Sequence, residues 1–236
     1  MIKRIILDEI KRIFRDKMYI FFLVYPLLMI LLSLWLLPYL NDNAGALAAN
    51  IVSLVFILLT PFVFGALSAF SLLDDRDDQV FASLKITPLR LSTYITIKLA
   101  ISYLFALVAT LATLFLNNYV EISILDKFLI AILAAITAPL VTLLINAFSR
   151  NKVEGFVIMK ATGILILAPI ASIFITDWTE LFLGVIPLFW PARIVTLSFM
   201  NGTALLSSTW YFVIGVLINS LFTFALYLLF KKRTKN

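Results

Sequence analysis

Residues 51–73 read IVSLVFILLTPFVFGALSAFSLL, and residues 74–90 continue as DDRDDQVFASLKITPLR. The first string runs for 23 positions without a charge, which matches the roughly 20 apolar residues that a membrane-spanning helix needs. The whole chain of 236 residues is 63% apolar and 14% charged, against about 45–50% and about 25% in a soluble domain. A water-soluble core cannot bury this excess of apolar residues. The sequence therefore predicts an all-α integral membrane protein.

Six apolar segments reach spanning length and predict one six-span bundle over residues 18–230. They are Met18–Leu37, Ile51–Leu73, Leu91–Leu116, Phe128–Phe148, Phe156–Ile175 and Trp210–Phe230. Four of these spans contain a proline, which predicts bends at Pro26, Pro61, Pro139 and Pro169. A further apolar stretch, Leu181–Met200, contains two prolines and Arg193. For this stretch we expect short broken helices at the extracellular surface, with Arg193 in the interface.

The basic residues orient the bundle. Of the 19 Lys and Arg residues, 17 lie in four places. These are the segment before the first span, the connection from the second span into the first turns of the third, the connection from the fourth span into the fifth, and the segment after the last span. Positively charged residues stay on the cytoplasmic side of a membrane. Both termini and the connections 74–90 and 149–155 are thus predicted to be cytoplasmic. This placement explains the net charge of +6 without a nucleic-acid partner.

The two ends of the chain flank the bundle in different ways. In residues 1–17 the apolar side chains recur at the spacing of one helical face, and charged residues occupy the other. Such a helix lies flat in the membrane interface. It is either a simple topological anchor or an elbow that transmits movement to the first span. Residues 231–236 form a basic cytoplasmic tail.

The acidic string after the second span is the most unusual feature of the chain. Four of the 13 acids occupy positions 74–78, at the start of a short amphipathic helix that Pro88 ends. Three interpretations stay open. The acids could hold magnesium and a diphosphate, although a second Asp-rich motif is absent from the sequence. They could be a solvated charge run. They could also belong to a docking helix for a cytoplasmic partner.

The order of these features resembles the membrane subunits of ABC transporters of the ABC-2 type. The residues that carry the resemblance are Asp75-Arg76-Asp77, Leu84 and Thr87-Pro88-Leu89, with Lys98 in the third span. The stretches Asn151–Lys160 and Gly184–Pro191 are similar to a narrower group, the small bacterial permeases of drug export, which include fluoroquinolone exporters. The ABC-2 permeases usually have Glu-Arg-Glu at the acidic motif, where this chain has Asp-Arg-Asp. The replacement keeps the charge and shortens the acidic side chains.

The resemblance implies a permease subunit of an ATP-driven exporter in the plasma membrane of a bacterium. The acidic segment would be the coupling helix and would sit in a groove of a separate cytoplasmic ATPase subunit. A second permease, either the same chain or a sister chain, would complete the export pathway within the lipid bilayer. The implied coupling residues are Asp74, Asp75, Arg76, Asp77, Asp78, Gln79, Phe81, Leu84 and Pro88.

The composition excludes several kinds of chemistry. The chain has no cysteine and no histidine, which excludes zinc-thiolate sites and the Ser-His-Asp triad. It also lacks a GxxxxGK[ST] phosphate loop, so ATP and magnesium are expected in the partner ATPase and no cofactor in this chain. Two alternatives remain: a membrane-embedded prenyl- or phospho-transferase that uses Asp74–Asp78 with magnesium, and a membrane anchor or immunity protein with the same fold.

The predicted orientation can be tested with single cysteines in this cysteine-free chain. Residues 38–50, 117–127 and 176–209 are predicted to be extracellular, because together they hold two cations and five acids. An impermeant thiol reagent on intact cells should label a cysteine at position 43 and leave one at position 152 unlabelled. Labelling at 152 without labelling at 43 would reverse the orientation.

Overall fold

The computed structural model describes residues 7, 9–11, 14–84, 86–117, 120–199 and 205–235. The regular elements in these ranges are α-helices and 3-10 helices. In chain order they are α2 (Lys17–Ala44), α3 (Ala46–Asp77), α4 (Val80–Leu84), α5 (Leu91–Leu116), α6 (Ile124–Ala135), α7 (Thr137–Phe148), α8 (Lys152–Gly163), η1 (Ile164–Ile166), η2 (Ala168–Ile173), η3 (Trp178–Val185), α9 (Phe189–Leu197) and α10 (Ser208–Lys235).

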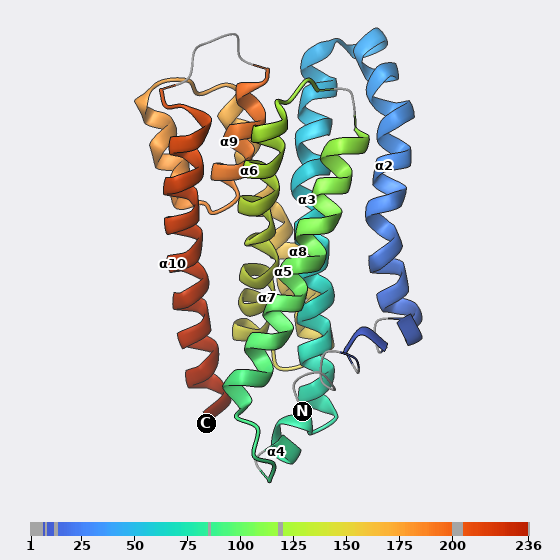
Figure 1. Cartoon of the computed structure of the whole chain (residues 1–236), viewed down its shortest axis with the longest axis vertical. Coiled ribbons are helices and arrows are strands. Elements are labelled where there is room, and N and C mark those ends of the chain that lie inside the picture. The colour runs from blue at the N-terminus through green and yellow to red at the C-terminus, as the bar shows by residue number, and fades with distance from the viewer. Residues whose placement is uncertain are drawn as a thin grey trace.

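The long helices run side by side along the long axis of the molecule (Figure 1). At one end lie α4 and the C-terminus, and at the other lie the junction of α2 with α3 and the short helix α9 (Figure 1). The most apolar windows of α3 and of the α6–α7 unit are 72% and 67% buried, whereas those of α2, α5 and α10 are 22%, 28% and 11% buried. Thus α3 and α6–α7 form the centre of the bundle, and the other three long helices present apolar side chains outward.

Five helical units in the described ranges are long and apolar enough to cross a membrane: Lys17–Ala44, Ala46–Asp77, Leu91–Leu116, Ile124–Phe148 and Ser208–Arg233. Each contains one of the predicted spans. The 32 residues of α3 would extend about 48 Å, whereas the hydrocarbon core is about 30 Å thick. A helix of this length is long enough to place the acidic residues at its end beyond such an apolar layer.

The predicted span Phe156–Ile175 is helical over most of its length but is not one α-helix. Its α-helical part ends at Gly163, and the chain continues through the 3-10 helices η1 and η2. Pro169 lies in the first turn of η2. Because proline has no backbone N–H, an α-helix continuing through this position would lose one of its hydrogen bonds. Pro139 has a similar effect, because the fourth span divides into α6 and α7 three residues earlier, at Ile136. Pro26 and Pro61, in contrast, lie inside continuous helices.

A glycine allows the two central helices to approach closely. A Cβ atom at Gly65 of α3 would lie 2.7 Å from the carbonyl oxygen of Ala138 and 2.8 Å from the Cβ of Val141. Thr142 of α7 donates a hydrogen bond of 2.9 Å to the Gly65 carbonyl oxygen. Small residues at such crossings are the usual means by which membrane helices pack, because apolar side chains gain little from leaving lipid.

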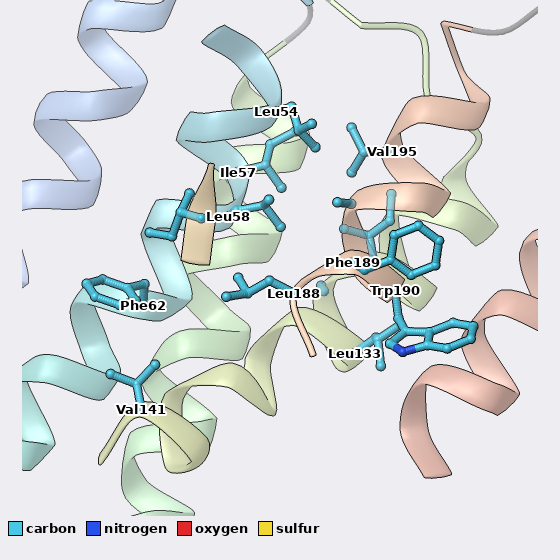
Figure 2. Packing of buried hydrophobic residues seen from close by; sticks show 14 of the residues in the cluster. Leu54, Ile57, Leu58, Phe62, Leu133, Val141, Leu188, Phe189, Trp190 and Val195 are labelled. Atoms are coloured by element: carbon cyan, nitrogen blue, oxygen red, sulfur yellow. The ribbon is translucent and has the colours of Figure 1, made fainter. Parts of the chain in front are cut away.

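Buried apolar residues of α3, α6–α7 and the α9 region form a shared core, part of which Figure 2 shows. Leu54, Ile57 and Leu58 of α3 belong to this cluster together with Phe189 and Trp190 of α9. The Trp190 indole N–H donates to the Gly184 carbonyl oxygen at 3.0 Å. This bond links η3 to α9. The two short helices confirm the predicted break in the stretch Leu181–Met200.

Arg193 is fully buried in protein, and its predicted depth at the membrane interface stays a prediction. Its guanidinium forms an ion pair with the equally buried Glu180 and donates to the Ser172 carbonyl oxygen at 2.6 Å. The Tyr211 hydroxyl of α10 donates to the same carboxylate. A buried cation is tolerated when a carboxylate and carbonyl groups replace its water. This cluster joins η2, η3, α9 and α10.

The predicted interfacial helix 1–17 falls mainly outside the described residues. Of this segment, the structure describes residues 7, 9–11 and 14–17. The described residue that matters for the site is Glu9, whose side chain is buried against the bundle.

Candidate functional site

The nine predicted coupling residues lie at the end of the molecule where α3 stops (Figure 1). They occupy three settings. Asp74, Asp75 and Arg76 belong to the last turns of α3 and are buried or half-buried. Asp77, Asp78 and Gln79 are exposed around the turn from α3 into α4. The remaining three are the half-buried Phe81 and Leu84 of α4 and the exposed Pro88 that precedes α5.

The side chain of Lys98 is the centre of a buried polar cluster. Lys98 lies in the second turn of α5 and is 1% exposed. Its ammonium forms ion pairs with Asp75 of α3 and with Glu9, the latter with an Nζ–Oε2 distance of 3.0 Å. It also donates to the Ser71 hydroxyl oxygen at 2.7 Å. The Ser71 hydroxyl in turn donates to Glu9 Oε1 at 2.7 Å.

The second partner of Asp75 comes from α5 as well. The Tyr94 hydroxyl, one helical turn before Lys98, donates to Asp75 Oδ2 at 2.8 Å. A buried carboxylate without such donors would lose its hydration without compensation. The lysine, the tyrosine and the serine provide that compensation, and together they fix α3, α5 and the segment that carries Glu9 relative to one another.

Asp74, the neighbouring acid, faces other helices. Its carboxylate accepts a hydrogen bond from the Tyr19 hydroxyl of α2 and pairs with Lys152 at the start of α8, with an Nζ–Oδ1 distance of 2.5 Å. The Lys152 side chain is 40% exposed, so this outer pair contributes less to stability than the Lys98 pairs do. Asp74 and Asp75 thus connect one end of α3 to three neighbouring helices.

Arg76 binds the end of α7. Its Nη1 donates to the Ser149 carbonyl oxygen at 2.9 Å, and its Nη2 donates to the Asn146 carbonyl oxygen at 3.5 Å. The last carbonyls of a helix have no partner within the helix, and the negative end of the helix dipole favours a cation. Arg76 therefore caps α7 and does not extend toward solvent as a partner-facing residue would.

The turn into α4 presents the other two acids outward. Asp78 N–H donates to the Asp74 carbonyl oxygen at 2.8 Å and so closes α3. Gln79 then adopts a φ of 55°, the left-handed conformation that commonly ends a helix. Phe81 of α4 packs against the cluster of Ile95, Leu143 and Phe230. This apolar contact holds α4 against the bundle while Asp77 and Asp78 remain exposed.

The geometry does not favour the magnesium hypothesis for Asp74–Asp78. Asp74 and Asp75 pair with lysines of different helices, and Asp77 and Asp78 lie on the exposed side of the turn. Across the ranges that the structure describes, no group of three or more acidic side chains is arranged to hold a metal ion. A magnesium site needs several oxygen ligands that converge on one point, and these acids diverge.

A family model described as fluoroquinolones export permease protein Rv2686c-like matches residues 9–227. The chain belongs to this family of export permeases. The matched range contains the whole acidic segment, Lys98 and its partners.

Two curated relatives of this permease come from Mycobacterium tuberculosis. They are the fluoroquinolones export permease protein MT2760 of strain CDC 1551 / Oshkosh and the fluoroquinolones export permease protein Rv2686c of strain ATCC 25618 / H37Rv. Each is 30% identical to the permease over 163 residues, which cover 68% of this chain and 63% of the relative. The match thus spans less than two thirds of the relatives' length. No solved structure matches the chain.

The sequence analysis did not predict the buried part of the permease's site. It placed Lys98 among the cations at the foot of a span, and it assigned no role to Glu9, Ser71, Tyr94 or Tyr19. One signal was present, because Lys98 lies seven residues into an apolar span and an ionisable group there needs a buried partner. That the partners include Glu9, 89 positions earlier in the chain, depends on how the helices pack.

Replacing the buried lysine tests this cluster. Lys98→Met leaves the carboxylates of Asp75 and Glu9 buried without their cation, which should cost about 3–5 kcal/mol. At about 2–4 °C per kcal/mol, the Tm of the purified permease should fall by about 10 °C. Thermal unfolding in detergent measures the change. Adding Asp75→Asn to Lys98→Met should restore part of it.

The matched control is Lys160→Met, because Lys160 is an exposed lysine of α8. Its Tm should stay within about 2 °C of the parent value, since exposed substitutions change stability by about 0.5 kcal/mol or less. Equal Tm values for the parent and Lys98→Met would contradict the assignment of Lys98 as the stabilising cation.

Proposed function

We propose that this chain is the membrane-spanning permease subunit of an ATP-driven ABC exporter in the plasma membrane of a bacterium, with both ends in the cytoplasm. Membership of an export-permease family supports a transport role. The observation that carries the ATP-driven mechanism is the end of α3, where exposed acids on a turn are attached to a helix whose preceding residues are anchored in the bundle.

This arrangement suits the transmission of force. A partner that binds Asp77, Asp78 and the outer side of α4 would pull on α3 through a continuous helix of 32 residues. The pairs of Asp74 and Asp75 would pass the movement to α2, α5 and α8. A free loop would absorb such movement, whereas a turn fixed by Phe81 and Arg76 would not. We therefore propose that α4 is the coupling helix.

The partner we propose is a cytoplasmic ATPase subunit, which would bring the ATP and the magnesium. The 236 residues lack a GxxxxGK[ST] phosphate loop, the usual cradle for nucleotide phosphates. The partner would bind the exposed acids in a groove with basic residues at its rim, because complementary charge orients such interfaces. The contribution of this chain would then be mechanical, with no catalytic residue of its own.

The sixth crossing would be made by α8, η1 and η2 together. The 12 residues of α8 span about 18 Å, and the nine residues of η1 and η2 add about 18 Å. Together they are long enough for a hydrocarbon core of about 30 Å. The nine residues of α9 reach only about 14 Å. An even number of crossings would leave both ends of the chain on the same side.

Two permeases would complete the export pathway, and the cargo would be an amphipathic drug-like molecule. The apolar outer sides of α2, α5 and α10 offer the area for a second copy or a sister chain, as well as for lipid. Both relatives are named for the export of fluoroquinolones, which are aromatic and amphipathic compounds. We extend that class of cargo to this chain.

Reversing the exposed acids tests the coupling role. Asp77→Lys with Asp78→Lys should leave membrane insertion and Tm near the parent values, because substitutions at exposed positions change stability by about 0.5 kcal/mol or less. Co-purification of the ATPase subunit should fall sharply, since loss of one partner of an interface charge pair costs about 2–5 kcal/mol. Leu84→Ala should weaken the same association with less dependence on salt, whereas Phe81→Ala should act indirectly, by loosening α4 from the bundle.

Lys232→Gln in the tail is the control, and its association with the ATPase should match that of the parent. If the double Asp variant bound and stimulated the ATPase like the parent, the acids would be a solvated charge run. If it abolished a magnesium-dependent transferase activity of the purified chain, the transferase alternative would replace the export role.

A further inference from the structure

A cavity of about 380 Å³ opens beside the turn described above, among the ends of α3, α7 and α10 and one side of α4. Its volume lies within the range of about 300–1,000 Å³ that is typical of ligand sites. Its charged lining residues within the described ranges are all cations. The residues that line it are Arg76, Phe81, Asn146, Ser149, Arg150 and Arg233.

The three arginines have no carboxylate partner within ion-pair distance in the part of the chain that the structure describes. Arg76 and Arg233 instead donate to backbone carbonyls at the end of α7. The dipole at a helix end supplies about half a negative charge. Two acids lie nearby: the charge of Asp77 acts on Arg76, and Glu154 accepts from the backbone N–H of Arg150. Neither acid binds a guanidinium, so the cavity keeps an excess of positive charge.

The cavity also has unused hydrogen-bond donors. Each guanidinium carries five N–H donors, and Arg76 uses two of its five on α7. A ligand that satisfies these donors must offer several anionic oxygens, as a phosphate group does.

We propose that this cavity binds the phosphate group of an anionic phospholipid headgroup of the phosphatidylglycerol type. Arg76, Arg150 and Arg233 would contact the phosphate oxygens. The cavity lies where the spans end, and α10 beside it is the least buried long helix. Basic pockets between membrane helices on the cytoplasmic side bind headgroups of this kind. Free phosphate offers the same anionic oxygens but lacks the glycerol headgroup and the acyl chains.

This site would add a lipid contact to α4. Phe81 lines the cavity and also attaches α4 to the bundle, so a bound headgroup would lie between α4 and the ends of α7 and α10. The proposal concerns the isolated chain and needs no ATPase. Its failure would therefore leave the proposed coupling role unaffected, and failure of the coupling role would leave this site unaffected.

Thermal unfolding of the full-length protein in neutral detergent tests the proposal, with tryptophan fluorescence as the signal. Phosphatidylglycerol at ten times its Kd should raise the Tm by about 4 °C, and phosphatidylcholine at the same mole fraction should not. Arg150→Gln and Arg233→Gln should each remove most of this shift. Arg150 is exposed and its side chain does not cap α7, so Arg150→Gln should keep the parent fold even if Arg76→Gln does not.

Arg90→Gln is the matched control, because Arg90 is an exposed arginine at the same end that does not line the cavity. It should keep the full shift. An arginine-dependent shift with inorganic phosphate alone would support the site with free phosphate as its ligand. Equal shifts in the parent and all variants would indicate general contact with lipid and overturn the proposal. If neither phosphatidylglycerol nor inorganic phosphate changed the Tm of the parent, the proposal would be overturned as well.

Discussion

The buried ammonium of Lys98 is the interaction on which the end of this bundle depends. It is enclosed by the carboxylates of Asp75 and Glu9 and by the Ser71 hydroxyl. Each of these groups would be costly to bury alone, and each is tolerated because the others are present. The cluster therefore fixes the angle and the depth at which α3 leaves the bundle. It also determines where the turn into α4 is presented.

One acidic string thereby serves two purposes. Consecutive residues of a helix point about 100° apart, so a short run of acids cannot all face one side. Asp74 and Asp75 turn toward α2, α5 and α8, whereas Asp77 and Asp78 turn outward. Asp74 and Asp75 hold α3 in the bundle, and Asp77 and Asp78 remain exposed on the turn that follows it. We interpret this division as the reason that an export permease can carry so dense an acidic cluster outside a metal site.

Much of the architecture was predictable from the sequence because it follows from local properties. The length of the apolar runs predicted five helices that are long and apolar enough to cross a membrane. Pro139 and the proline before Trp190 marked breaks that the structure confirms. Other features depend on residues far apart in the chain. The pairing of Lys98 with Glu9 and of Arg193 with Glu180 required the packed bundle. The end of α8 at Gly163 followed from a change of helix type that the apolar pattern of that segment does not reveal.

The most direct test of the central claim is a footprint of the ATPase subunit on α4. The chain has no cysteine of its own, so single cysteines at Ser83, exposed on α4, and at Lys232, in the tail, report on two places at the same end of the bundle. Their rates of thiol labelling are measured in inside-out vesicles with and without the ATPase subunit. We predict that the subunit slows labelling at position 83 at least tenfold and leaves position 232 unchanged. Unchanged labelling at position 83 with the ATPase bound would contradict the account.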